Sequence, residues 1–167
     1  MPVDLNQYRD NARANGMCAD YERAWDNCCS LKQIFDMALG VKAIDFLCDS
    51  IAKGWGLSPN VISERFSGFL NGRYVSHQKG YDSVMYCMFK GNMVAKETAI
   101  CVISSDMDVH IPISHICEIY ACKGSKIRLH GPGKCIVVCY GDEKDVEVSG
   151  DCKSWRRINK KNRDANG

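Results

Sequence analysis

The sequence predicts an α+β protein, with an N-terminal helical bundle followed by a C-terminal β-rich repeat. In the helical half, apolar residues recur at helical spacing, whereas in the β half they alternate with a period of two. Residues 100–148 also hold three successive β-rich units, each a strand, a short polar turn and a second strand. Such segregation of helices and strands is typical of α+β folds. We therefore expect a helical subdomain at 1–72, a β-rich subdomain at 73–152 and a basic flexible tail at 153–167.

Five helical segments are expected in the first 72 residues. Ser30 and Ser58 each precede a run with helical periodicity and can cap a helix through the side-chain oxygen. Pro59 suits a first helical turn, where its missing N–H costs nothing. The expected segments are 3–15, 19–28, 31–38, 41–53 and a last helix from Ser58 to near Asn71.

The repeat at 100–148 allows two architectures, a short β-solenoid or an antiparallel β-sandwich. A solenoid predicts nearly equal spacing between equivalent positions, which favours it slightly, and the helical half could then cap one end. The strand expected at 83–89 should end at Lys90-Gly91-Asn92. The recurring apolar positions are Ile103, Ile119 and Val137, spaced by 16 and 18 residues, and Ile111, Leu129 and Val148, spaced by 18 and 19.

The composition is that of an ordinary folded protein, with 46% hydrophobic and 25% charged residues. A net charge of +2 is too small to argue for nucleic acid, but it divides into +5 for the tail at 153–167 and −3 for the rest. No run approaches the roughly 18 consecutive apolar residues of a membrane span, and the N-terminus lacks the features of a secretory signal. We therefore expect no membrane association.

The eleven cysteines are expected to be reduced and mostly buried as small apolar side chains. Cys117, Cys122, Cys135 and Cys139 resemble a four-cysteine zinc site in spacing. However, a strand rises ~3.3 Å per residue, which places Cys135 and Cys139 roughly 13 Å apart. Cys117 and Cys122 should lie on opposite faces of their strand. One ion could bridge neither pair, so we expect these cysteines to belong to the core.

Other chemical motifs are weak. The adjacent Cys28-Cys29 pair permits a thiol-dependent enzyme, but one buried and one half-exposed cysteine at a helix junction is the favoured explanation. His110 and His130 fall at similar points of successive units and could stack on a solvent face. No phosphate-binding loop, zinc-protease motif or nucleophile elbow occurs. We therefore expect no catalytic residue, no cofactor and no metal.

Residues 48–73 resemble a helix-turn-helix motif. Ala52 occupies the small position where the two helices cross, and Gly56 lies in the turn. This resemblance implies a DNA-binding regulator as an alternative function, although a low local density of Lys and Arg disfavours it. The implied DNA-binding residues are Lys53, Ser58, Asn60, Ser63, Arg65 and Arg73.

The basic tail offers a second candidate contact surface. Its charges could bind an acidic partner or nucleic acid, with the tryptophan stacking against it. The candidate contact residues are Trp155, Arg156, Arg157, Lys160 and Lys161.

Six stretches carry a further resemblance, namely Tyr8–Arg13, Gly54–Pro59, Asn71–Ser76, Gly80–Ser83, His115–Tyr120 and Cys139–Asp142. They are similar to an uncharacterised protein family encoded by gut Bacteroides genomes and their phages. The resemblance implies a phage or mobile-element product in the host cytoplasm or the virion, and it implies no known activity. Our leading hypothesis is a non-enzymatic interaction protein, phage structural or accessory, that binds a protein partner or another copy of itself.

Overall fold

The computed structural model describes residues 5–28, 30–41 and 43–157. Within them the N-terminal part is helical, as predicted. The caps are local: Ser30 Oγ accepts a hydrogen bond from the Gln33 backbone N–H, and Ser58 Oγ accepts one from that of Val61. The helices are α1 (Leu5–Ala14), α2 (Ala19–Asp26), α3 (Leu31–Ala38), α4 (Ile44–Lys53) and α5 (Pro59–Leu70).

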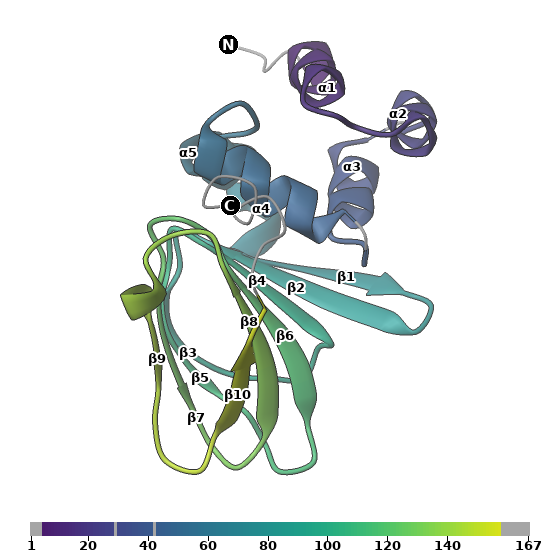
Figure 1. The fold of residues 1–167 in the computed structure, drawn as a ribbon. Coiled ribbons are helices and arrows are strands. Elements are labelled where there is room, and N and C mark those ends of the chain that lie inside the picture. Colours follow the sequence, from purple (N-terminus) through teal and green to yellow (C-terminus); the bar gives the residue numbers. More distant parts are fainter. Residues whose placement is uncertain (1–4, 29, 42, 158–167) are drawn as a thin grey trace, which may run out of the picture.

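The C-terminal part is a β-solenoid of about four turns (Figure 1). Sheet A has the strand order β1-β2-β4-β6-β8-β10, and sheet B has the order β3-β5-β7-β9. The strands are β1 (Arg73–Gln78), β2 (Tyr81–Cys87), β3 (Lys90–Val94), β4 (Ala99–Ile103), β5 (Asp106–His110), β6 (Ile116–Ala121), β7 (Lys126–His130), β8 (Lys134–Cys139), β9 (Val146–Val148) and β10 (Lys153–Arg156).

The pairing distinguishes the two predicted architectures. In the described residues, only β1 and β2 pair antiparallel, and every other pair is parallel. From β2 onwards, consecutive strands alternate between the two sheets, so each turn of the chain stacks on the previous one. The solenoid prediction is confirmed, and the sandwich alternative does not hold. The solenoid also begins one turn before the predicted repeat, with β2 and β3.

The predicted ladders of apolar residues are each wrong at one position. In sheet A, Val137 pairs with Ile119, and Ile119 pairs with Ile100 rather than with Ile103. In sheet B, Val148 pairs with Leu129, and Leu129 pairs with Val109 rather than with Ile111. The turns between strands differ in length, so spacing alone does not fix the register. Ile103 lies an odd number of residues from Ile100 and therefore faces the opposite side of sheet A.

Two segment boundaries also need correction. Lys90-Gly91-Asn92 do not end a strand but begin β3, because the chain turns earlier, at Met88, which has a φ of 52°. Residues 153–156 are not part of a flexible tail but form β10, which pairs parallel with β8. Residues 158–167 lie outside the described residues.

The fold has two cores that share sheet A. The inner core fills the solenoid, where Ile100, Ile119 and Leu129 are fully buried. The outer core lies between sheet A and the helices, and it contains Phe35 and Cys48. The helices therefore cover part of the outer face of sheet A rather than capping an end of the solenoid (Figure 1). No helix in the described part of the chain is both long and apolar enough to cross a membrane.

Candidate functional site

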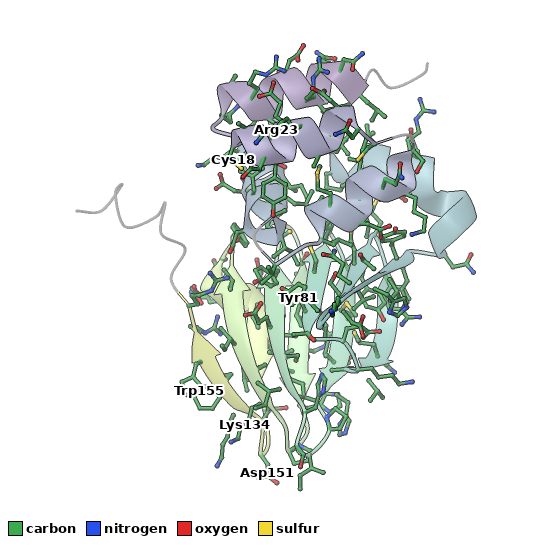
Figure 2. All side chains as sticks on the ribbon, turned by 90° about the vertical axis from the view of Figure 1, so that its right-hand side faces the viewer. Cys18, Arg23, Tyr81, Lys134, Asp151 and Trp155 are labelled. Carbon is green, nitrogen blue, oxygen red and sulfur yellow. The ribbon has the colours of Figure 1, made fainter. Side chains whose placement is uncertain are left out.

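The part of sheet A that the helices leave uncovered carries large apolar side chains. On β6 and β8, the helices contact the second half of each strand, through residues such as Tyr120 and Val138. The first half is open, and Figure 2 shows Lys134 and Trp155 on this lower part of the molecule, away from the helices. We define the Trp155 face as Ile116, Lys134, Ile136, Lys153 and Trp155.

Parallel pairing sets the Trp155 face in two rows. Lys153 and Ile116 each pair with Lys134, and Trp155 pairs with Ile136 in the next outward-facing row. Trp155 is 55% exposed and Ile116 is 62% exposed. Along each strand, the residues that alternate with those of the Trp155 face, such as Cys117, point into the solenoid. The alternation of the strands thus collects one aromatic and two aliphatic side chains beside two lysines.

The charges at this end of the chain divide into paired and unpaired groups. Arg156 pairs with Glu143, and Arg157 pairs with Asp45. Lys134 and Lys153 form no ion pair with any described residue. Among the predicted tail contacts, Trp155 lies on the exposed Trp155 face. Arg156 and Arg157 instead have partners within the protein. Lys160 and Lys161 lie outside the described residues.

A polar network lies between the Trp155 face and the helices. Glu118 accepts hydrogen bonds from the hydroxyls of Tyr120, at 2.6 Å, and Tyr81, at 3.2 Å. Burial and the Glu118 carboxylate both raise the pKa of Tyr120 and of Tyr81. The two hydroxyls therefore stay protonated as hydrogen-bond donors, which suits structural bracing rather than acid–base chemistry.

The outer face of sheet B pairs some of its charges internally. Arg128 contacts Asp106 at 2.7 Å and Asp108 at 2.9 Å. His110 and His130 pair in register, with their Nδ1 atoms 3.3 Å apart, which confirms the predicted stacking. Lys90 and Lys126 flank Asp106 on this face without a described ion-pair partner, so unpaired lysines alone do not distinguish the Trp155 face. Its exposed tryptophan does.

The residues implied by the helix-turn-helix resemblance are largely engaged within the protein. Lys53 pairs with Asp49, Ser58 caps α5, and Arg73 lies on β1, where it contacts Glu97 at 3.2 Å. Asn60 and Arg65 are exposed, and Ser63 is half-buried. On the other side of α5, Ile62 is fully buried in the outer core. This arrangement shows how α5 packs on the solenoid and does not test DNA binding.

The four cysteines with zinc-like spacing do not all converge on one point, although Cys117 and Cys135 pair in register on β6 and β8. Cys117 and Cys135 are buried inside the solenoid, Cys139 packs partly against the same core, and Cys122 belongs to the outer core. The geometric argument made from the sequence is therefore confirmed for Cys117 and Cys122, which face opposite sides. Cys29 lies outside the described residues.

A different set of cysteines comes together. The Sγ atoms of Cys48, Cys101 and Cys122 all lie within 4.8 Å of one another, and all three residues are buried. Burial raises the pKa of the Cys48 and Cys122 thiols, whereas their S–H groups lower that of Cys101. The sequence pattern does not reveal this cluster, because Cys48 and Cys101 are 53 residues apart and Cys101 and Cys122 are 21 residues apart. Only the register of β4 and β6 and the docking of α4 reveal it.

The helices enclose an apolar cavity of about 370 Å³. Trp25, Phe35 and Phe46 are among its lining residues, and Trp55 adds an indole N–H that has no hydrogen-bond partner in the structure. Trp55 packs against Phe46, with ring centroids 5.0 Å apart. One unpaired donor in an apolar cavity is too little to define a ligand.

No protein-family model, curated protein or solved structure matches this chain. The fold and the side-chain geometry therefore carry the functional argument.

Proposed function

We propose that this chain is a non-enzymatic interaction protein, which docks a protein partner on the Trp155 face. The occupant is a protein segment that carries both large apolar and acidic side chains. The observation that carries the proposal is an exposed tryptophan in register with Ile136, beside two lysines that have no described ion-pair partner.

The apolar side chains provide the affinity. Burying apolar surface contributes about 25 cal/mol per Å². Tryptophan is enriched among the few interface residues that dominate binding energy. Isolated exposed apolar residues are common, but Trp155, Ile136 and Ile116 lie on adjacent strands of one face.

The lysines provide the charge preference. Lys134 and Lys153 lie directly opposite each other on neighbouring strands. Like charges in that position destabilise a sheet, and an acidic partner would relieve the repulsion. A nucleic acid is also acidic. However, the isoleucines beside Trp155 suit apolar side chains better than a phosphate backbone, so we favour a protein.

This function agrees with both settings predicted from the resemblance. A virion component and an accessory protein of the host cytoplasm would each need such a docking face. The phage-related origin stays a prediction.

Selection from a library of displayed random peptides tests the proposal. We expect enriched peptides to combine acidic with large apolar residues and to lose binding to the Trp155→Ala variant. Met88→Ala is the matched control, because Met88 is 51% exposed and lies outside this face. Enrichment of peptides that bind both variants equally would contradict the proposal. Concentration-dependent self-association that Trp155→Ala abolishes would assign the face to a second copy, and duplex binding that it abolishes would assign it to nucleic acid.

A further inference from the structure

The cluster of Cys48, Cys101 and Cys122 joins the two parts of the fold. Cys48 lies on α4, Cys101 lies on β4, and Cys122 directly follows β6. Their exposed fractions are 0%, 0% and 2%. All three are free thiols, so no disulfide explains their proximity.

The backbone fixes this arrangement. Cys101 pairs with Tyr120, so the alternation of β6 returns Cys122 to the same outer face. The Cys122 N–H donates to the Val102 carbonyl, which holds the end of β6 beside β4. α4 lies above both strands, and Asp45 near its start is tied to Arg157. The three sulfurs thus come from three separately anchored segments.

The sulfur spacing fits one thiophilic ion. A metal–sulfur bond of ~2.3 Å places sulfurs that share a three- or four-coordinate ion roughly 3.8 to 4.0 Å apart. The Cys48 and Cys101 sulfurs are 3.6 Å apart, and all three separations are at most 4.8 Å. Small side-chain rotations would equalise them.

The donor set selects the kind of ion. Thiolates favour soft ions such as Cu⁺ and Zn²⁺ over Mg²⁺ or Ca²⁺. Among the described residues, no histidine, carboxylate or fourth cysteine completes the cluster. We propose that Cys48, Cys101 and Cys122 form a three-thiolate site for one soft d¹⁰ cation, which staples α4 to sheet A. The three thiols release their protons to solvent as the sulfurs bind the ion.

This inference is independent of the Trp155 face. The cluster is buried beneath the helices, whereas the Trp155 face lies where the helices are absent. Such burial also implies that the ion binds most readily while the chain folds, because the open chain exposes the ligands.

The test refolds the reduced full-length chain with Cu⁺ or with Zn²⁺ in separate arms. We expect one ion per chain, a higher unfolding temperature, and three sulfur ligands at ~2.3 Å by X-ray absorption. The arm with the tighter binding identifies the ion. Cys101→Ser should weaken binding by more than the roughly 10–100-fold typical of losing an outer-shell contact.

Cys117→Ser is the matched control, because Cys117 is equally buried but lies inside the solenoid. It should retain the metal. Metal binding that Cys101→Ser leaves intact, or that Cys117→Ser removes equally, would overturn the proposal. So would the absence of binding in both arms.

A second measurement uses only the wild-type chain and therefore does not depend on whether a variant folds. Prolonged alkylation of the native chain reaches buried thiols when the helices open locally. Peptide mass spectrometry should then show that metal-loaded wild-type chain protects Cys48, Cys101 and Cys122 relative to metal-free chain, with Cys117 unchanged. Protection confined to other cysteines, such as the exposed Cys18, would overturn the assignment.

Discussion

Arg157 and Asp45 lie 112 residues apart in the sequence, yet they form a two-pronged ion pair with nitrogen–oxygen distances of 3.1 to 3.3 Å. Asp45 also accepts a hydrogen bond from the Tyr140 hydroxyl. One carboxylate therefore ties α4 both to the residue that follows β10 and to the residue that follows β8. This contact helps to hold the helices on the solenoid.

Replacing Asp45 should loosen that attachment. The ion pair itself is partly exposed and contributes little. However, Asp45→Ala also leaves the half-buried Tyr140 hydroxyl without its acceptor, which costs about 1–3 kcal/mol. Urea unfolding measures the loss. Glu143→Ala is the control, because it removes only the exposed pair with Arg156, and a loss as large as that of Asp45→Ala would contradict this account.

The solenoid register predicts opposite outcomes for two isoleucines of β6. Ile119 is fully buried among the inner ladders, whereas Ile116 is 62% exposed. Ile119→Ala should cost about 2–5 kcal/mol of unfolding free energy, and Ile116→Ala should stay within about 0.5 kcal/mol. Chemical denaturation of both variants checks the difference. Equal losses of unfolding free energy would contradict the described orientation of β6, in which Ile119 points inward and Ile116 points outward.

The stability of the fold should fall in alkaline solution. Burial and the hydrogen bond to Asp36 raise the pKa of Tyr74 to about 12, and burial also raises that of Tyr81. In the unfolded chain tyrosine titrates near pH ~10. Because the folded pKa is the higher one, the stabilisation is fully present below pH ~10 and is lost as the pH rises towards about 12.

Absorbance of tyrosinate during a pH titration, alongside circular dichroism, tests this prediction. Part of the tyrosinate signal should appear late and together with unfolding. Complete titration near pH ~10 in a chain that remains folded would contradict it.

The sequence predicted what depends on neighbouring residues. The Ser30 and Ser58 caps and the alternation of the β half are local patterns, and the structure confirms them. Register is not local: the Ile103 assignment was wrong because turn lengths vary along the solenoid. β10 was missed because Lys-Ser-Trp-Arg lacks an apolar alternation and becomes a strand only by pairing with β8.

The sites depend on contacts between distant segments. Trp155 was singled out from the sequence as a stacking residue, but its neighbour Ile136 could be identified only from the β8–β10 register. The three-cysteine cluster needed the docking of α4 as well. The helix-turn-helix resemblance shows the converse, since a correct local pattern at 48–73 can reflect packing alone.

The affinity of one selected acidic–apolar peptide for matched variants tests the central claim most directly. Titration calorimetry would compare wild-type chain with Trp155→Ala and with Met88→Ala. Loss of a tryptophan at the centre of an interface costs about 2 kcal/mol or more, so Trp155→Ala should weaken binding by roughly 30-fold or more. Met88→Ala should leave it unchanged. An affinity that is the same for all three proteins would contradict the assignment of the Trp155 face as the docking surface.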